Sequence, residues 1–232
     1  IKRRSYDNPL IHKLPKKCFI KPDTIVPHIL QDKTDNKNEN LFYKAGPMKK
    51  IAYNINESNL KIAILNAGGL CPGLNNVIYD LVYSLENLYN IDNIYGVKNG
   101  YSGFLKHNMI KLNVDNIEGI QHDSGSILGT SRGKLDVNKI ASTIIDHKIN
   151  QLYIIGGDGT HRGAYELCKY FYEYSSSYDL SIMCIPKTID NDIPIIDKSF
   201  GYETAVNKAK YAIMSAYSEA KDTEHGLGIV KL

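Results

Sequence analysis

Three aspartates follow short apolar runs of the sequence, at positions where a carboxylate can bind a metal ion or accept a proton. Asp158 lies inside the glycine-rich segment Gly156–Thr160, and Asp190 and Asp192 lie on either side of Asn191. A bare carboxylate repels phosphate, so an aspartate in a glycine turn is expected to hold a cation that the phosphate shares, and Mg²⁺ suits this role. For the segment around Asp158 taken alone, a tight turn with a capping aspartate remains the alternative.

The pair Asp190 and Asp192 suits acid–base chemistry. One of two carboxylates set two residues apart can accept a proton from a substrate hydroxyl, while the other orients that group or a metal ion. A polar turn that caps the next element is the alternative. Asp190 follows Asp158 by 32 residues (190 − 158), about the length of one strand–helix–strand unit, so both are expected to emerge from neighbouring strand ends.

Two basic residues and one glycine could complement these carboxylates. Arg132 lies in a glycine-flanked loop, where a guanidinium could bridge the oxygens of a phosphoryl group in transfer. Lys187 could contact a phosphate. A surface ion pair is the alternative for Arg132, and a solvated turn is the alternative for Lys187. Gly159 leaves open the space that the α-phosphate of an adenine nucleotide needs, so a donor of that size is permitted there.

Short apolar runs alternate with helical periodicity from residue 61 onward. The runs predict strands over 61–66, 93–98, 152–155, 180–185 and 227–232, and the periodicity predicts helices after each of four turns or caps, at Gly73, Asp136, Thr160 and Gly201. This alternation predicts an α/β fold with a doubly wound, mostly parallel, Rossmann-like sheet. Ligands of such sheets bind at the carboxyl ends of the strands, where the glycine turns and the Thr188–Asp192 run lie.

The first 60 residues lack this patterning and are predicted to form an irregular N-terminal extension. Residues 31–40 have the composition of a polar loop or disordered insertion, and 41–52 could contain a short strand. We therefore predict two parts, the extension over 1–60 and a nucleotide-binding lobe over 61–232. The lobe is expected to be truncated, because the sequence ends inside a predicted strand.

Some apolar positions in this lobe are predicted to pack closely. Cys168 and Cys184 fall on apolar faces, where a free cysteine behaves as a small hydrophobe. The helix after Gly201 is expected to pack through a small-residue face, which comprises Val206, Ala209, Ile213, Ala216 and Ala220.

Composition narrows the class of protein. Hydrophobic residues make up 43% and charged residues 23% of the 232 residues, as in ordinary globular proteins. A net charge of +3 is too small to indicate nucleic-acid binding, and no apolar run reaches membrane-spanning length. The four cysteines lack metal-ligand spacing and predict reduced thiols in a cytosolic protein. The histidines, His161 among them, show neither triad nor ligand spacing.

Five short motifs occur together in the sequence: Gly68–Gly73, Ile127–Gly133, Gly156–Thr160, Pro186–Asp192 and Ile196–Gly201. In this order they resemble the phosphofructokinase family, most closely its ATP-dependent branch from plants and several protists. The Gly-Gly-Asp-Gly-Thr run also occurs in NAD kinases and diacylglycerol kinases, so the order of all five motifs carries the resemblance. The Thr188–Asp192 run and the Gly68 turn disfavour those two kinase classes, which do not need them.

The resemblance implies phosphorylation of fructose 6-phosphate to fructose 1,6-bisphosphate in glycolysis, with Mg²⁺ as cofactor and ATP as co-substrate. Asp190 would be the general base at the sugar's 1-hydroxyl, supported by Asp192. Arg132 would stabilise the transferring group, and Asp158 would ligate Mg²⁺. The implied nucleotide contacts are Gly69, Tyr101, Arg132, Gly133, Gly157, Asp158, Gly159 and Thr160, and the implied sugar-phosphate contacts are Lys187, Thr188, Ile189 and Asp190.

The resemblance further implies an allosteric, cytoplasmic homo-oligomer, either a dimer or a tetramer, that binds neither nucleic acid nor membranes. Family members with Asp at the position of Gly159 use pyrophosphate, so Gly159 favours ATP. The family continues past Leu232 into a lobe that holds the sugar phosphate, so this chain alone is expected to be inactive. A pyrophosphate-dependent phosphofructokinase and a non-catalytic nucleotide-binding relative are the alternatives.

Overall fold

The chain divides into two compact units, which are described separately. The computed structural model describes residues 5–31, 37–44, 46–51, 59–132, 135–175, 177–193 and 196–231. The smaller unit comprises Ile1–Asn59 and Ser84–Ile91, and the larger unit comprises Leu60–Tyr83 and Asp92–Leu232.

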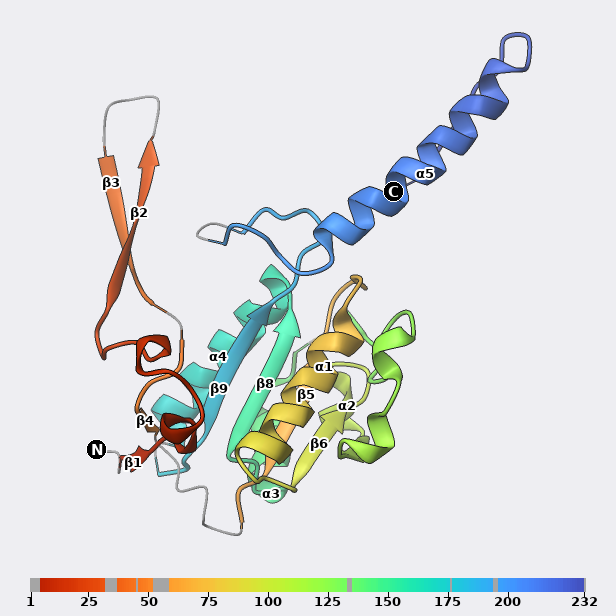
Figure 1. The fold of residues 1–232 in the computed structure, drawn as a ribbon. Coiled ribbons are helices and arrows are strands. Elements are labelled where there is room, and N and C mark those ends of the chain that lie inside the picture. Colours follow the sequence, from red (N-terminus) through yellow and green to blue (C-terminus); the bar gives the residue numbers. More distant parts are fainter. Residues whose placement is uncertain are drawn as a thin grey trace. The chain divides into compact units, whose positions relative to one another are not determined.

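The larger unit is built on a five-stranded sheet with the order β7–β6–β5–β8–β9 (Figure 1). Strands β5, β6, β8 and β9 run parallel, whereas β7 pairs antiparallel with β6. The sheet is therefore mostly parallel, as the sequence predicts. The strand bounds are β5 (Ile62–Asn66), β6 (Ile94–Val97), β7 (Met109–Leu112), β8 (Gln151–Gly156) and β9 (Ser181–Pro186).

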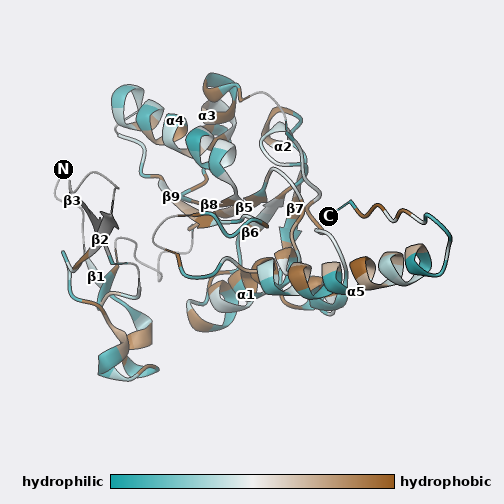
Figure 2. Ribbon diagram, turned by 90° about the horizontal axis from the view of Figure 1, so that it is seen from above, coloured by the Kyte–Doolittle hydropathy of each residue, from teal (hydrophilic) through white to brown (hydrophobic). Residues whose placement is uncertain are grey.

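Helices cover both faces of this sheet, so the sheet is doubly wound. Helix α1 (Leu74–Tyr83) lies on one face, as the view along the sheet in Figure 2 shows. The opposite face carries α2 (Ser102–Leu105), α3 (Val137–Asp146) and α4 (Asp158–Tyr174). The remaining helical segments of this unit are η4 (Asp115–Ile117), η5 (Ile120–His122) and α5 (Tyr202–Lys221).

The core explains why β5 and β8 lie at the centre of the sheet. Every residue of β5 is buried, the pattern expected of a parallel strand covered on both faces. Ala63 and Leu65 of β5 join Leu152 and Ile154 of β8 in one apolar cluster with side chains of α3 and α4. Burial of each large aliphatic side chain of this kind contributes about 1.5–3 kcal/mol to folding. This packing fixes the strand ends that carry the glycine turns.

Local signals set where two of the helices begin. The Asp136 side chain accepts a hydrogen bond of 3.1 Å from the Lys139 backbone N–H, which confirms the predicted cap of α3. Helix α4 begins directly after Gly157. Gly156 has to be a glycine, because a Cβ there would overlap the side chain of Thr160.

The smaller unit contains short antiparallel pairs. Strand β1 (Tyr6–Asp7) pairs with β4 (Lys50–Ile51), and β2 (Ile25–Gln31) pairs with β3 (Lys37–Tyr43). Buried Asn8 donates a hydrogen bond of 2.8 Å from Nδ2 to the Met48 carbonyl. The helical segments of this unit are η1 (Pro9–His12), η2 (Lys16–Cys18) and the π-helix η3 (Ser84–Leu88).

Several details differ from the sequence prediction. Residues 37–40 were predicted as loop but lie in β3, because they pair with residues 28–31 of β2. The predicted strand at 227–232 is wrong for the described residues 227–231, which pair with no strand there. The chain turns back after α5, so that Gly226 and Gly228 approach the carbonyls of Ala220 and Ala216 on that helix.

Two predicted packing surfaces are also wrong. Helix α5 buries no side chain, and Val206 and Ile213 on its predicted packing face are 49% and 48% exposed. Cys168 and Cys184 are exposed, because they lie at the flank of α4 and on the outermost parallel strand β9. All four thiols are free, and Cys71 alone among them is buried. In the described part of the chain, no helix is both long and apolar enough to span a membrane.

Candidate active site

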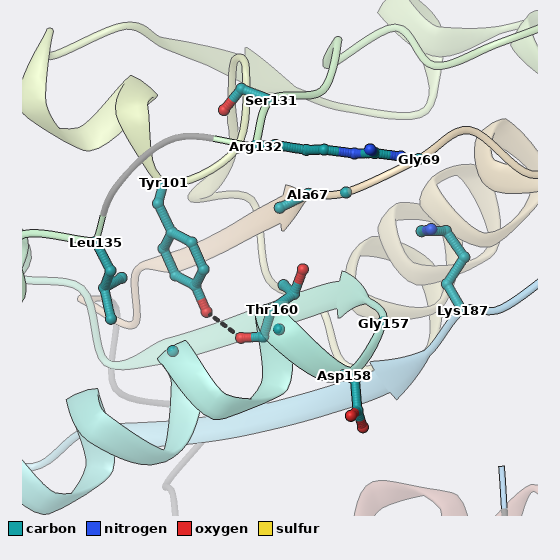
Figure 3. A pocket seen from close by; sticks show the side chains of 13 residues that line it. Ala67, Gly69, Tyr101, Ser131, Arg132, Leu135, Gly157, Asp158, Thr160 and Lys187 are labelled. Carbon is teal, nitrogen blue, oxygen red and sulfur yellow. Dashed lines mark hydrogen bonds between the residues drawn. The ribbon is translucent and has the colours of Figure 1, made fainter.

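A cavity of about 380 Å³ opens at the carboxyl ends of β5 and β8 (Figure 3). The glycine turn after β5, the loop that contains Arg132 and the first turn of α4 meet around it. A doubly wound sheet is expected to bind ligands at this edge. The cavity is lined by Ala67, Gly68, Gly69, Tyr101, Ser131, Arg132, Leu135, Gly157, Asp158, Gly159, Thr160, Gly163 and Lys187.

Two hydrogen bonds fasten the arginine loop to the turn after β5. The Gly68 N–H donates to the Ser131 carbonyl at 3.2 Å, and the Thr130 hydroxyl donates to the Gly68 carbonyl at 2.5 Å. The Arg132 Nη2 lies 3.5 Å from the place that a Cβ would take at Gly69, so the guanidinium lies directly beside this glycine (Figure 3). The turn and the cation therefore form one surface.

Two buried asparagines accept hydrogen bonds from the segment that leads into the arginine loop. Asn66, at the end of β5, accepts a hydrogen bond of 2.7 Å from the Ser126 hydroxyl, and Asn75 accepts one of 2.8 Å from the Ile127 N–H. Both side chains are buried, and the Asn66 Nδ2 has no hydrogen-bond partner in the structure. The sequence analysis missed these residues, although an asparagine that closes an apolar strand was an available signal.

The first turn of α4 presents backbone N–H groups to the cavity. N–H groups at the start of a helix lack intrahelical partners, and the helix dipole adds partial positive charge there. Such an end binds anions. Nothing lies within 4 Å of the place that a Cβ would take at Gly159, whereas Thr160 is buried. The open space at Gly159 thus belongs to the cavity.

Asp158 lies at the mouth of the cavity. Its side chain is 93% exposed and makes an ion pair of 3.2 Å with Arg162 one turn along α4. An exposed pair of this kind contributes little to stability. The carboxylate is therefore accessible to a cation that arrives with a ligand.

Tyr101 closes the inner end of the cavity. Its hydroxyl donates a hydrogen bond of 2.8 Å to the Thr160 carbonyl, drawn as a dashed line in Figure 3. Burial of the ring raises the pKa of this phenol well above its ordinary value, so the hydroxyl keeps its proton and remains a donor. The ring also lies close to Gly163, where a Cβ would stand 3.2 Å from it.

Lys187 is a buried cation beside the glycine turn. Its residue is 6% exposed, and its Nζ lies 3.8 Å from the place that a Cβ would take at Gly68. Burial lowers the pKa of this ammonium, and nearby Arg132 lowers it further, whereas Cys71 raises it. Within the described part of the chain Lys187 forms no ion pair, so an anionic ligand would supply the missing counter-charge.

His161 is a further neighbour that the sequence analysis set aside. Its Nε2 is buried and has no hydrogen-bond partner among the described residues, and burial lowers the pKa of the ring. The charge of Asp158 raises the pKa of the ring, and the charge of Lys187 lowers it. The neutral ring packs between the first turn of α4 and the end of β9, and no spacing rule in the sequence marks it.

The run Thr188–Asp192 forms a separate loop after β9. The Thr188 hydroxyl donates to the Asp192 carboxylate at 2.8 Å and accepts from the Asp190 N–H at 3.1 Å. Asp190, Asp192 and Ile189 are exposed, and none of Thr188, Ile189, Asp190 and Asp192 lines the cavity. Lys187, grouped with them from the sequence, lines the cavity instead. Gly133 lies outside the described residues.

A metal ion at this site would have to share its ligands with a substrate. The described residues contain no group of three or more His, Cys, Asp or Glu side chains that could hold a metal ion. Mg²⁺ at phosphate sites is commonly held by one or two carboxylates together with phosphate oxygens and waters. The single accessible carboxylate of Asp158 beside a cavity lined by cations fits that arrangement.

The fold and the cavity define a doubly wound α/β protein with a cavity at its strand ends, where two basic side chains and a helix N-terminus would suit an anion. Comparison with known proteins agrees with this class. The family model "Phosphofructokinase" matches residues 61–232. ATP-dependent 6-phosphofructokinase 7 of Arabidopsis thaliana is 43% identical over 233 residues, which cover 98% of this chain and 47% of that protein. The ATP-dependent 6-phosphofructokinase of Entamoeba histolytica is 44% identical over 190 residues, covering 81% and 43%.

Solved structures of similar fold carry the same family name. Pichia pastoris phosphofructokinase in the T-state superposes with a TM-score of 0.63 at 27% identity, over 71% of this chain and 18% of that chain. The pyrophosphate-dependent phosphofructokinase of Marinobacter aquaeolei, at 24% identity, gives a TM-score of 0.59 over 70% and 42%, and it shows the fold alone. This chain belongs to the phosphofructokinase family. It spans about half the length of the relatives that it matches.

Proposed function

We propose that the complete protein transfers the γ-phosphoryl group of ATP to the 1-hydroxyl of fructose 6-phosphate. The observation that carries this proposal is the convergence of the Gly69 turn, Arg132, Lys187 and the start of α4 on one cavity. Phosphoryl transfer depends on positioning and on stabilising charge that spreads over the phosphoryl oxygens. Two cations and a helix N-terminus around one cavity provide both.

On this proposal the cavity binds the nucleotide donor. Arg132 and the buried Lys187 neutralise the phosphates, and the N–H groups of Gly159 and Thr160 donate hydrogen bonds to them. Tyr101 keeps the first turn of α4 in place through its bond to the Thr160 carbonyl. Gly159 leaves room for the α-phosphate, because nothing lies within 4 Å of its missing side chain.

Asp158 would hold Mg²⁺ together with the donor phosphates. The ion, when bound, would supply positive charge against the charge that develops during transfer. Asp158 itself orients the ion and contributes no proton transfer. Its exposed carboxylate can leave Arg162 for the ion at little cost, since exposed ion pairs are weak.

Asp190 would accept the proton of the sugar hydroxyl. The Asp190 backbone N–H donates a hydrogen bond to the Thr188 hydroxyl, so the Asp190 carboxylate takes no part in that bond. Asp192, held by the same hydroxyl at 2.8 Å, would fix the shape of the loop. Thr188, Ile189 and Lys187 would then contact the sugar phosphate or the phosphoryl group that is being transferred.

A pyrophosphate-dependent enzyme is the second candidate, because solved relatives with that name share the fold. It is disfavoured by the absence of a carboxylate at Gly159 and by the ATP-dependent names of the more similar relatives.

Three further properties of the protein are also proposals: homo-oligomeric assembly, a division into two parts at residue 60, and a cytoplasmic location. Two of the similar Arabidopsis proteins are named chloroplastic.

A coupled assay of the complete protein with fructose 6-phosphate distinguishes these candidates. Specificity constants for ATP and pyrophosphate are compared at saturating Mg²⁺, and ATP is expected to give the higher value. A higher value with pyrophosphate would reject ATP as donor. Binding of ATP without any transfer, at any sugar-phosphate concentration, would favour a non-catalytic relative.

A further inference from the structure

The segment Ser199–Phe200–Gly201 packs directly on the glycine turn after β5. The Cys71 thiol donates a hydrogen bond of 3.0 Å to the Phe200 carbonyl. The Phe200 ring lies 3.5 Å from the place that a Cβ would take at Gly73. Gly201 has a positive φ of 84°, and a Cβ there would overlap the Pro72 carbonyl and the Cys71 Sγ. The segment therefore packs against the turn, and at Gly201 the packing leaves no space for a side chain.

The same segment holds the loop that carries Asp190. The buried Ser199 donates from its hydroxyl to the Thr188 carbonyl at 2.7 Å and from its N–H to the Asn191 Oδ1 at 2.7 Å. Asn191 adopts a left-handed φ of 53°, which places the backbone in a conformation that side chains other than Gly, Asn and Asp rarely adopt. Ser199 thus holds the Thr188 backbone before Asp190 and the Asn191 side chain after it.

Between the turn at Gly68–Gly73 and the loop at Thr188–Asp192, the described residues form no direct hydrogen bond. Ser199–Phe200–Gly201 contacts both of them through adjacent residues of one short backbone. A displacement of this backbone would therefore move the turn and the loop relative to each other. Transfer between two bound molecules is sensitive to such a displacement, since a misplacement of about 1 Å can cost on the order of 100-fold in rate.

We propose that Ser199–Phe200–Gly201 is a positioning element that sets the distance between the phosphate-binding turn and the loop of Asp190. The proposal rests on the proposed function for its kinetic consequence. Its structural content, a mechanical connection between the two loops through Ser199 and Cys71, holds independently of which reaction occurs. Neither side chain lines the cavity, and the proposal gives neither of them a contact with the reacting groups, so both are positioning residues.

Hydrogen exchange of backbone amides tests the connection without any assay of activity. The substitution Ser199→Ala removes the bond to Thr188 and is expected to accelerate exchange in residues 188–192 and also in residues 68–73. The expected acceleration is roughly 5-fold, the effect of losing one hydrogen bond. Ser215→Ala is the matched control, because the Ser215 hydroxyl also donates to a carbonyl, that of Tyr211 at 3.0 Å, but does so on the exposed α5. Acceleration confined to 188–192 would overturn the proposal.

The reciprocal substitution tests the other end. Cys71→Ala is expected to accelerate exchange in residues 188–192, whereas Cys71→Ser keeps a donor toward the Phe200 carbonyl and is expected to resemble the unchanged protein. If Cys71→Ala left residues 188–192 unaffected, the connection would be refuted. The two substitutions act on different sides of the segment, so the failure of one variant to fold still leaves the other as a test.

Kinetics of the complete protein then separate positioning from binding. Ser199→Ala is expected to lower kcat by about 10-fold, while the KM values for ATP and fructose 6-phosphate change by less than about 3-fold, because misplacement affects the transfer step. A change confined to KM would contradict the positioning role. If the unchanged protein transfers no phosphoryl group, the proposed function fails, and the exchange experiment still decides the connection.

Discussion

The cavity at the start of α4 and the loop of Asp190 are built in different ways from neighbouring strand ends. Glycine turns make up much of the cavity lining, the buried residues Thr160 and Lys187 also line it, and two hydrogen bonds fasten the arginine loop. The loop presents two exposed carboxylates and is shaped by the side chains of Thr188, Asn191 and Ser199. The proposed anion site is thus preorganised in the fold, whereas the proposed proton transfer would depend on a few side-chain hydrogen bonds.

This contrast predicts the largest effect at the loop. Asp190→Asn is expected to lower kcat by roughly 100- to 10,000-fold, which is typical for the loss of a general base. ATP binding, measured by calorimetry, is expected to stay within about 3-fold, because Asp190 does not line the cavity. Asp197→Asn, at an exposed aspartate just beyond the loop, is the control. Near-normal turnover of Asp190→Asn would remove the role given to this residue.

A carboxylate placed in the cavity is expected to have the next largest effect. Gly159→Asp should fold normally, since nothing lies within 4 Å of the new Cβ, but should weaken ATP binding by roughly 100-fold through like-charge repulsion. Gly159→Ala separates size from charge. Gly156→Ala is the structural counterpart, because its Cβ would overlap Thr160, and a fall in Tm is expected for this variant alone. If Gly159→Asp bound ATP with unchanged affinity, this glycine would not lie at the donor site.

The buried ammonium of Lys187 predicts a pH-dependent effect. Because burial lowers its pKa, the proton is lost at a lower pH than in a free lysine, and the contribution of Lys187 to ATP affinity is lost as the pH rises through that value. Lys187→Met should weaken ATP binding about 10-fold at neutral pH, the effect of one charge-assisted hydrogen bond, and should abolish this alkaline decline. ATP titrations across a pH series provide the measurement. If ATP affinity still declined at alkaline pH in Lys187→Met, the decline would come from another group.

The same shift has the opposite sign for stability. The unfolded chain binds the Lys187 proton more tightly than the folded chain does, so the free energy of unfolding rises with pH between the lowered pKa and the ordinary value of 10.5. Denaturant titrations of the unchanged protein and of Lys187→Met, repeated at several pH values, are expected to differ in this slope.

The smallest effect is expected at Tyr101. Tyr101→Phe removes a buried hydrogen bond to the Thr160 carbonyl but keeps the packing of the ring, and should lower the free energy of unfolding by about 1 kcal/mol. ATP affinity should fall less than in Lys187→Met. Urea denaturation monitored by circular dichroism provides the measurement. A larger loss of affinity than of stability would indicate direct contact of the phenol with the nucleotide.

Much of the fold could be predicted because local patterns and tertiary structure agree in it. The apolar runs at Ile62–Asn66 and Gln151–Gly156 are buried strands, and Asp136 caps the helix that its position predicts. Antiparallel β7 was missed, since its residues Met109–Leu112 carry no period that distinguishes a strand from a loop. The tail beyond Leu227 has strand-like composition, but a strand also needs a partner, which composition does not reveal.

Which residues lie together at the site depends on where their side chains point, and neither motif spacing nor periodicity shows this. Lys187 and Thr188 are neighbours in the chain, yet Lys187 lines the cavity and Thr188 does not. Asn66 and Ser126 are joined by a hydrogen bond across 60 residues of sequence, and Ser199 bonds back to Thr188 across 11, and no spacing rule marks either pair. The catalytic roles of Asp190, Asp192 and Arg132 stay predictions, as do the domain boundary and the oligomeric state.

Helix α5 has a consequence for the distribution of local stability in this chain. It buries no side chain over its 20 residues, whereas helices in proteins owe most of their stability to the packing of an apolar face. Local opening should therefore occur far more often in α5 than in β5 and β8, whose residues lie in the core. Proteases should accordingly cut the 232-residue chain first within or near α5, and the sheet should remain as a resistant fragment.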